Sequence, residues 1–186
     1  MKYKKVKNNK GFSFIEVMIV ISIIGIMSAV GMVGFNSSKS KTRLELSQRT
    51  LTAAIKLAQS YAIQGRVQES QVPCGYGVVF TSTAEFRIFY NISSAGKDCQ
   101  EINAEPTLSN FKYNAGTSRL IDLFKLEKDV FLDSPVFVNS GVYFSTPRAS
   151  AYNYSGVSLG TQAYTLKYNS STKTVTVGSE GSVTEQ

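Results

Sequence analysis

The chain has 186 residues and a formal net charge of +7, but five of its 20 basic residues lie within residues 1–10. Residues 66–186 carry ten basic and eleven acidic side chains, so this part lacks the net basic surface that nucleic-acid binding usually needs. The chain has no His and only two Cys, which excludes most zinc, haem and catalytic-triad chemistry.

A basic leader precedes a long apolar run. Residues 1–10 hold five lysines and no acid, and residues 12–35 are mostly Ile, Val, Met, Phe, Gly and Ala. About 20 apolar residues suffice to cross a bilayer as a helix, and lysines before such a run keep that end in the cytoplasm. The pattern predicts a single pass through the inner, or cytoplasmic, membrane by residues 12–35, with the rest of the chain outside the cytoplasm.

Three interpretations compete for this run. A secretory signal would be cut after it, for instance at Ala29-Val30-Gly31, but its apolar region spans only about 7 to 15 residues. A plain membrane anchor leaves Glu16 unexplained, because ionisable groups in the bilayer are costly and usually functional. A cut before the run, after Gly11, would give Phe12 a positively charged α-amino group, and Glu16 would lie one helical turn further on the same face.

The segment Lys10-Gly11-Phe12-Ser13-Phe14-Ile15-Glu16 resembles the prepilin signature of type IV pilins and type II secretion pseudopilins. The resemblance implies cleavage by prepilin peptidase between Gly11 and Phe12, N-methylation of Phe12, and docking of subunits through Glu16, which would face the terminal amine of a neighbouring subunit. It also implies the partners: other pilin subunits, the peptidase, an inner-membrane assembly platform and, before assembly, membrane lipid. After assembly the chain would lie in a pilus or in a periplasmic or extracellular filament.

Helical spacing continues beyond the apolar run. After the polar residues 36–41 comes an apolar stripe that we expect to be core, and its members are Leu44, Leu51, Ile55, Ala58 and Ala62, widened by Leu46, Leu57 and Tyr61. Gln48 lies mostly off this stripe. Gln64-Gly65 fits a C-terminal stop, so we expect one helix over residues 12–64.

From Val72 onward the hydrophobic period changes to two, which predicts strands. One expected hairpin joins residues 76–81 to 85–90, with Val78, Phe80, Phe86 and Ile88 on its inner face, and another joins residues 163–168 to 172–177. Further strands are expected at residues 119–126, 130–132, 136–139 and 141–145, with a long loop at 93–118, an exposed segment at 149–162 and a frayed tail at 178–186.

The two cysteines, Cys74 and Cys99, would both lie outside the cytoplasm, in a compartment where disulfides form. We therefore expect a disulfide between them; the alternative is two separate buried thiols. A metal site is not expected, since no other soft ligand lies nearby, and neither a cofactor nor a catalytic residue is predicted.

Together these elements predict an α+β protein, a pilin "lollipop" in which one long N-terminal helix packs its amphipathic half on an antiparallel β-sheet head. The expected parts are a leader (1–11), a transmembrane and filament-core helix (12–35), the amphipathic half of the same helix (36–65) and a β-rich head (66–186).

The head itself resembles H-type pseudopilins and FimT-like minor pilins in residues 75–80 with the strand after them, in residues 142–149 and in the closing hairpin that ends at Val177. This resemblance implies a minor or priming structural subunit of a type IV pilus or type II secretion-like filament, and not an enzyme.

Two alternatives to a minor or priming subunit stay open. One is the major pilin of the filament, and the other is a DNA-capturing minor pilin of a competence pilus. A basic patch for DNA would consist of Lys112, Arg119, Lys125 and Lys128. The small net negative charge of residues 66–186 argues against nucleic acid as a partner.

Overall fold

The computed structural model describes residues 11–92, 99, 118–135, 140–153 and 160–186 and, for residues 30–37, only the helical backbone. The chain divides into two compact units, residues 1–40 and 41–186. Helix α1, Phe14–Gln64, begins in the first unit and ends in the second. Over the described residues, no helix combines the length and apolar character that crossing a membrane requires.

Both ends of α1 have a local cause. The carbonyl of Ser13 accepts hydrogen bonds from the backbone N–H of Glu16 and Val17, at 3.0 and 3.3 Å, so the helix starts two residues later than the sequence predicted. At the other end Gly65 has a φ of +56°. This left-handed conformation, which costs glycine little, ends the helix. The predicted stop at Gln64-Gly65 is therefore confirmed.

Nine strands form two antiparallel sheets in the described part of the second unit. The five-stranded sheet has the order β3-β2-β1-β5-β6, with β1 at Gly75–Phe80, β2 at Glu85–Asn91, β3 at Ser118–Lys125, β5 at Gly141–Ser145 and β6 at Ala151–Asn153. The four-stranded sheet has the order β4-β7-β8-β9, with β4 at Phe131–Ser134, β7 at Thr161–Tyr168, β8 at Ser171–Gly178 and β9 at Val183–Glu185. The predicted α+β class and both predicted hairpins are confirmed; the strand predicted at 136–139 and most of the 93–118 loop lie outside the described residues.

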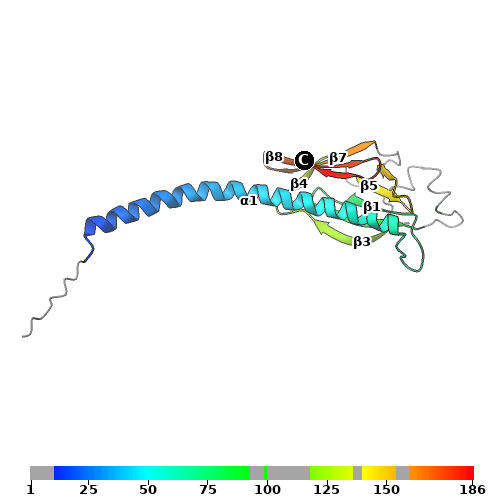
Figure 1. The fold of residues 1–186 in the computed structure, drawn as a ribbon, viewed down its shortest axis with the longest axis horizontal. Coiled ribbons are helices and arrows are strands. Elements are labelled where there is room, and N and C mark those ends of the chain that lie inside the picture. The colour runs from blue at the N-terminus through cyan, green and yellow to red at the C-terminus, as the bar shows by residue number, and fades with distance from the viewer. Residues whose placement is uncertain (1–10, 93–98, 100–117, 136–139, 154–159) are drawn as a thin grey trace, which may run out of the picture. The chain divides into compact units, whose positions relative to one another are not determined.

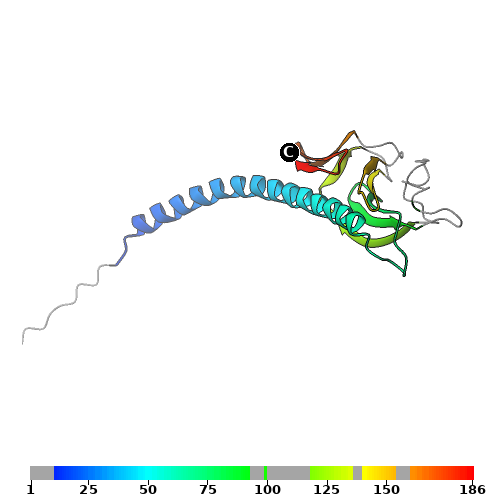
Figure 2. The ribbon, with the colours of Figure 1, turned by 45° about the vertical axis from the view of Figure 1, so that its right-hand side comes forward.

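The core of the second unit lies between the second half of α1 and the two sheets. Figures 1 and 2 both show the cyan half of α1 running alongside the strands. The predicted stripe is confirmed as core, because Leu44, Leu51, Ile55, Ala58 and Ala62 are all at most 3% exposed. They belong to one cluster with inward side chains of both sheets, among them Val78, Phe80, Phe86, Ile88, Tyr164 and Val175. The prediction that Leu46 widens this stripe is wrong: the residue is 48% exposed, because it lies on the solvent side of the helix.

The C-terminal residues are part of the fold, so the prediction of a frayed tail at 178–186 is wrong. β9 pairs with β8 in antiparallel register, and the paired residues are Val175 with Glu185, Thr176 with Thr184 and Val177 with Val183. Gln48, expected off the core stripe, is only 2% exposed. Its Nε2 donates to the backbone oxygens of Thr174, at 2.9 Å, and Gln186, at 3.0 Å, which fixes both strands to the helix.

The segment predicted to be exposed at 149–162 is also partly buried. Ala149 and Ala151 are 3% and 1% exposed. The reason is that β6 continues the five-stranded sheet by pairing with β5, so its first residue faces the core. Residues 154–159 of this segment lie outside the described residues.

We expect Gln48→Leu to lower the free energy of unfolding by about 1–3 kcal/mol, because the two hydrogen bonds that join the helix to Thr174 and Gln186 are lost. Denaturant unfolding of the full chain in detergent measures this change. Gln64→Leu is the matched control, since Gln64 is exposed and its Nε2 reaches only the neighbouring Ser60 hydroxyl. Equal stability of the two variants would show that the Gln48 contacts do not hold the C-terminal strands.

Candidate docking and processing site

The segment before α1 is non-helical and open. Gly11, Phe12 and Ser13 precede the helix. A Cβ built on Gly11 meets no atom within 4 Å, and Phe12 is 83% exposed. The peptide bond between Gly11 and Phe12 therefore lies in non-helical backbone whose flanking side chains leave it uncovered. Residues 1–10 of the predicted leader lie outside the described residues.

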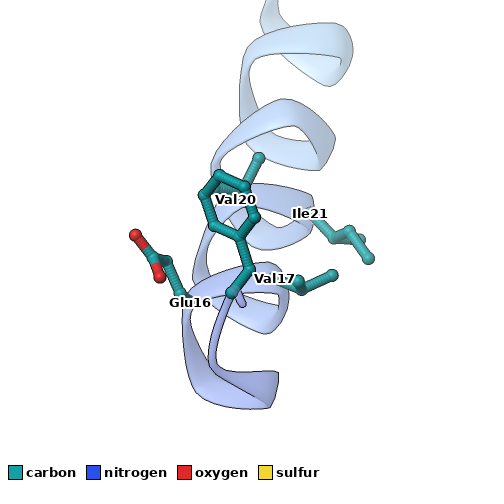
Figure 3. Close-up of a pocket in the computed structure, with 5 residues that line it drawn as sticks. Glu16, Val17, Val20 and Ile21 are labelled. Atoms are coloured by element: carbon teal, nitrogen blue, oxygen red, sulfur yellow. The ribbon is translucent and has the colours of Figure 1, made fainter. Parts of the chain in front are cut away.

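Phe12 and Glu16 line one shallow hollow on the first unit. The hollow has a volume of about 260 Å³, and its other walls are Val17, Val20 and Ile21. Figure 3 shows the Glu16 carboxylate projecting from the opposite side of the helix to Val17 and Ile21. The predicted proximity of Phe12 and Glu16 is thus present, in a site whose other side chains are all aliphatic.

The Glu16 carboxylate makes no hydrogen bond or ion pair with any residue that the structure describes. Ser13 and Glu16 have the Ser-x-x-Glu spacing of a capping box, in which the Glu side chain would reach back to the N–H of Ser13. That bond is not formed here; Glu16 instead supplies its own N–H to the Ser13 carbonyl. Its negative charge lies in the first turn of the helix, where the positive end of the helix dipole stabilises it. The carboxylate is therefore available to a cation from outside this part of the chain.

An apolar surface extends from this site along the helix. Eleven large hydrophobic side chains between residues 14 and 27 are 45% or more exposed: Phe14, Ile15, Val17, Met18, Ile19, Val20, Ile21, Ile23, Ile24, Ile26 and Met27. Monomeric soluble proteins rarely expose so large a continuous apolar patch, and such patches mark surfaces that meet a membrane or another protein. The surface therefore needs a covering of lipid or of other apolar side chains.

Two serines on this part of the helix form hydrogen bonds within the helix. Ser22 Oγ donates to the Met18 carbonyl at 2.8 Å, and Ser28 Oγ donates to the Ile24 carbonyl at 2.7 Å. A hydroxyl bonded to the carbonyl four residues earlier needs no partner from solvent. The serines therefore leave the surface compatible with an apolar environment, a role that the sequence analysis did not assign to them.

The predicted disulfide is confirmed. Cys74 and Cys99 are bridged, with their Cα atoms 4.8 Å apart and a sequence separation of 25. Cys74 is fully buried. Its N–H donates to the Asn91 carbonyl, and its carbonyl accepts a hydrogen bond from the N–H of Thr146. The bridge thus links Cys99, which follows β2 in the chain, to the residue directly before β1. The backbone hydrogen bonds of Cys74 already hold that residue in place.

The candidate basic patch is partly neutralised. Lys125 Nζ lies 2.7 Å from Glu85 Oε1 on the neighbouring strand. Arg119 and Lys128 are exposed, and Lys112 lies outside the described residues. One of the three described basic side chains therefore already has an acidic partner, which reduces the positive charge that this face offers to a polyanion.

Perturbed titration in the head comes from buried tyrosines. Burial raises the pKa of the Tyr164 hydroxyl far above its ordinary value, because the phenolate would be desolvated. Tyr164 packs against Phe80 in the core, with ring centroids 5.8 Å apart. Such a shift keeps the phenol neutral and reflects packing. Within the described ranges, no three His, Cys, Asp or Glu side chains gather where a metal ion could bind.

Comparison with known proteins finds a family model that matches the N-terminal pattern. Residues 6–32 match the family model of the prokaryotic N-terminal methylation motif. The chain is also 28% identical, over 123 residues, to the type IV major pilin protein PilA of Myxococcus xanthus (strain DK1622), and the match covers 61% of this chain and 54% of that protein. The chain thus matches about half the length of this curated relative. No solved structure matches the chain.

Proposed function

We propose that this chain, a type IV pilin-like protein, is a structural subunit of a type IV pilus or of a related type II secretion-like filament. The observation that carries the proposal is the exposed apolar surface of α1 with the unpaired Glu16 carboxylate at its start. Packing α1 of each subunit against α1 of its neighbours would cover that surface, and a cation from a neighbour would pair with Glu16. We propose no reaction catalysed by this chain and no cofactor.

The proposed mechanism is assembly from the membrane. Before assembly the apolar residues of α1 lie in lipid as a single pass through the inner membrane, with the leader lysines in the cytoplasm and residues 66–186 outside it. Prepilin peptidase removes the leader between Gly11 and Phe12. An inner-membrane assembly platform then moves the subunit into the filament, where Glu16 faces the methylated α-amino group of Phe12 from a neighbour. Pairing these two charges offsets the cost of burying each at low dielectric.

We expect Gly11→Leu to stay uncut, because a side chain at this position occupies space that the wild-type backbone leaves open to the peptidase. Mass spectrometry of the N-terminal peptide in the membrane fraction measures the result: wild type should begin at a methylated Phe12 and the variant at Met1. Gly25→Ala is the control, since a Cβ there also meets nothing within 4 Å. A variant that begins at Phe12 would show that another protease acts.

Within the filament we propose a minor or priming position. The support is the placement of Cys74 and Cys99 in the middle of the chain, together with the resemblance of the head strands to H-type pseudopilins and FimT-like minor pilins. The similarity to a Myxococcus major pilin favours the alternative of a major subunit. Quantifying the Phe12 peptide in sheared filaments separates the two: a minor subunit should be rare relative to the main filament protein, and a major one should dominate.

A further inference from the structure

We propose that the outer edge of β3 is a docking surface for a second copy of this chain. Two β3 strands would pair edge to edge and antiparallel, about a two-fold axis that places Leu120 of each copy opposite Leu123 of the other. This contact lies in the head, so the inference goes beyond the proposed function, in which subunits meet through α1. The cut before Phe12 and the docking of Glu16 do not depend on it.

β3 is the longest edge strand of the two described sheets. It is outermost in the five-stranded sheet, and its eight residues include no Pro or Gly. The other edge strands, β4, β6 and β9, have only four, three and three residues. Natural sheets keep their edges short, because an edge offers backbone N–H and C=O groups to another strand. Figure 1 shows β3, in light green, at the margin of the strands, where a second chain can reach it.

A bulge in β3 brings two leucines to the same face of the sheet. Leu123 pairs with Arg87 and Leu120 with Phe89, so β3 has one residue more than β2 between these pairs. Arg87 and Phe89 face away from the core cluster, because Ile88 between them belongs to it. Both leucines therefore face away from that core, and they are 38% and 43% exposed. The edge thus carries two neighbouring apolar side chains that no part of the chain covers.

The same bulge makes the strand compatible with a two-fold partner. A two-fold axis perpendicular to a sheet keeps each side chain on its own face, so residues directly opposite each other must share a face. Leu120 and Leu123 meet this condition. Arg119 and Phe124 meet it on the inner face, since they pair with Tyr90 and Phe86 of β2. One register therefore satisfies both faces, and it places Leu120 against Leu123 twice.

The charges on β3 favour a second copy over a partner of another kind. Lys125 already pairs with Glu85 at 2.7 Å. Arg119 and Asp122 are exposed, and neither forms an ion pair with another described residue. With Leu120 opposite Leu123, Asp122 of one copy is the diagonal neighbour of Arg119 of the other, within reach of a long side chain. A partner with charge of a single sign would leave one of these two residues unmatched.

Cysteine cross-linking of the full chain in detergent tests the register. Leu120→Cys and Leu123→Cys are mixed under mild oxidation, and covalent dimers are counted. We expect dimers in the mixture and few in either variant alone, because a disulfide needs Cα atoms within about 7 Å and the register brings only residue 120 near residue 123. Leu120→Cys mixed with Thr172→Cys is the control, since Thr172 is exposed on β8, in the other sheet.

Charge exchange tests whether the two copies recognise each other through Arg119 and Asp122. Sedimentation should show a dimer for wild type and a shift toward monomer for Asp122→Arg, because like charges would then face each other across the contact. The double variant Arg119→Asp with Asp122→Arg exchanges the two charges and should restore the dimer. This recovery separates a contact between copies from a loss of folding in the single variant.

Three results would overturn the inference and leave the proposed function intact. The first is a wild-type chain that stays monomeric. The second is a mixture of Leu120→Cys and Leu123→Cys that gives no more covalent dimer than the Thr172→Cys control. The third is a dimer that Asp122→Arg leaves unchanged, which would mean that the copies associate through α1. The proposed function fails by a different measurement, a wild-type precursor that is not cut before Phe12.

Discussion

Glu16→Ala should be cut and methylated normally yet be nearly absent from filaments. The scissile bond lies outside the helix and four residues before Glu16, so the change leaves it exposed. In the filament, however, the neighbour's α-amino group would lose its partner at low dielectric. Removing one member of a buried ion pair costs about 3–5 kcal/mol, which is more than about 100-fold in an association constant. The measurement compares the Phe12 peptide in membrane and sheared filament fractions.

The matched control for this loss is Glu45→Ala on the same helix. Glu45 Oε1 pairs with Arg49 Nη2 at 2.6 Å, and the side chain is 45% exposed, so its loss should cost only about 0.3–0.5 kcal/mol. Glu45→Ala should enter filaments at wild-type levels. Glu16→Gln tests the charge separately from the shape, and it should resemble Glu16→Ala. Normal incorporation of Glu16→Ala would refute the pairing of Glu16 with a neighbouring amine.

Local patterns carried most of what the sequence could predict. The helix stripe follows from a hydrophobic period of about 3.6, and the two hairpins follow from a period of 2. Both periods can be seen within one continuous segment of sequence. The N-terminal motif is equally local, because Gly11, Phe12 and Glu16 lie together before an apolar run and within residues 6–32, which match the methylation-motif family model; their roles in processing and docking stay predictions.

Contacts between distant segments account for what the sequence could not predict. Gln48 is a polar residue in the core because its amide reaches carbonyl oxygens 126 and 138 residues away. β9 has only three residues, Val183–Glu185, and becomes a strand by pairing with β8. Neither feature has a periodic signal of its own. The sequence therefore predicts a frayed tail, although the backbone there is held by both a sheet and a helix.

Cys99→Ala should cost the second unit about 3 kcal/mol of unfolding free energy. The two cysteines are 25 positions apart in sequence. In the chain-entropy model, closing a loop of this size raises the free energy of the unfolded chain by roughly 3 kcal/mol. Cys99 is the better position to change because Cys74 is fully buried. When Cys99 is replaced, the Cys74 thiol can stay in place as a small apolar group. Urea unfolding of the processed chain in detergent gives the difference.

Reductant supplies the control for this disulfide prediction. Wild type unfolded in the presence of a strong reductant should match Cys99→Ala, and the variant itself should not respond to reductant. Cys74→Ser should lose more stability than Cys99→Ala, because its hydroxyl is placed where no solvent reaches. A loss below about 1 kcal/mol for Cys99→Ala would mean that the backbone bonds from Cys74 to Asn91 and Thr146 already hold this edge of β1. The bridge would then secure only the segment beyond β2, and head stability would rest on the core between α1 and the sheets.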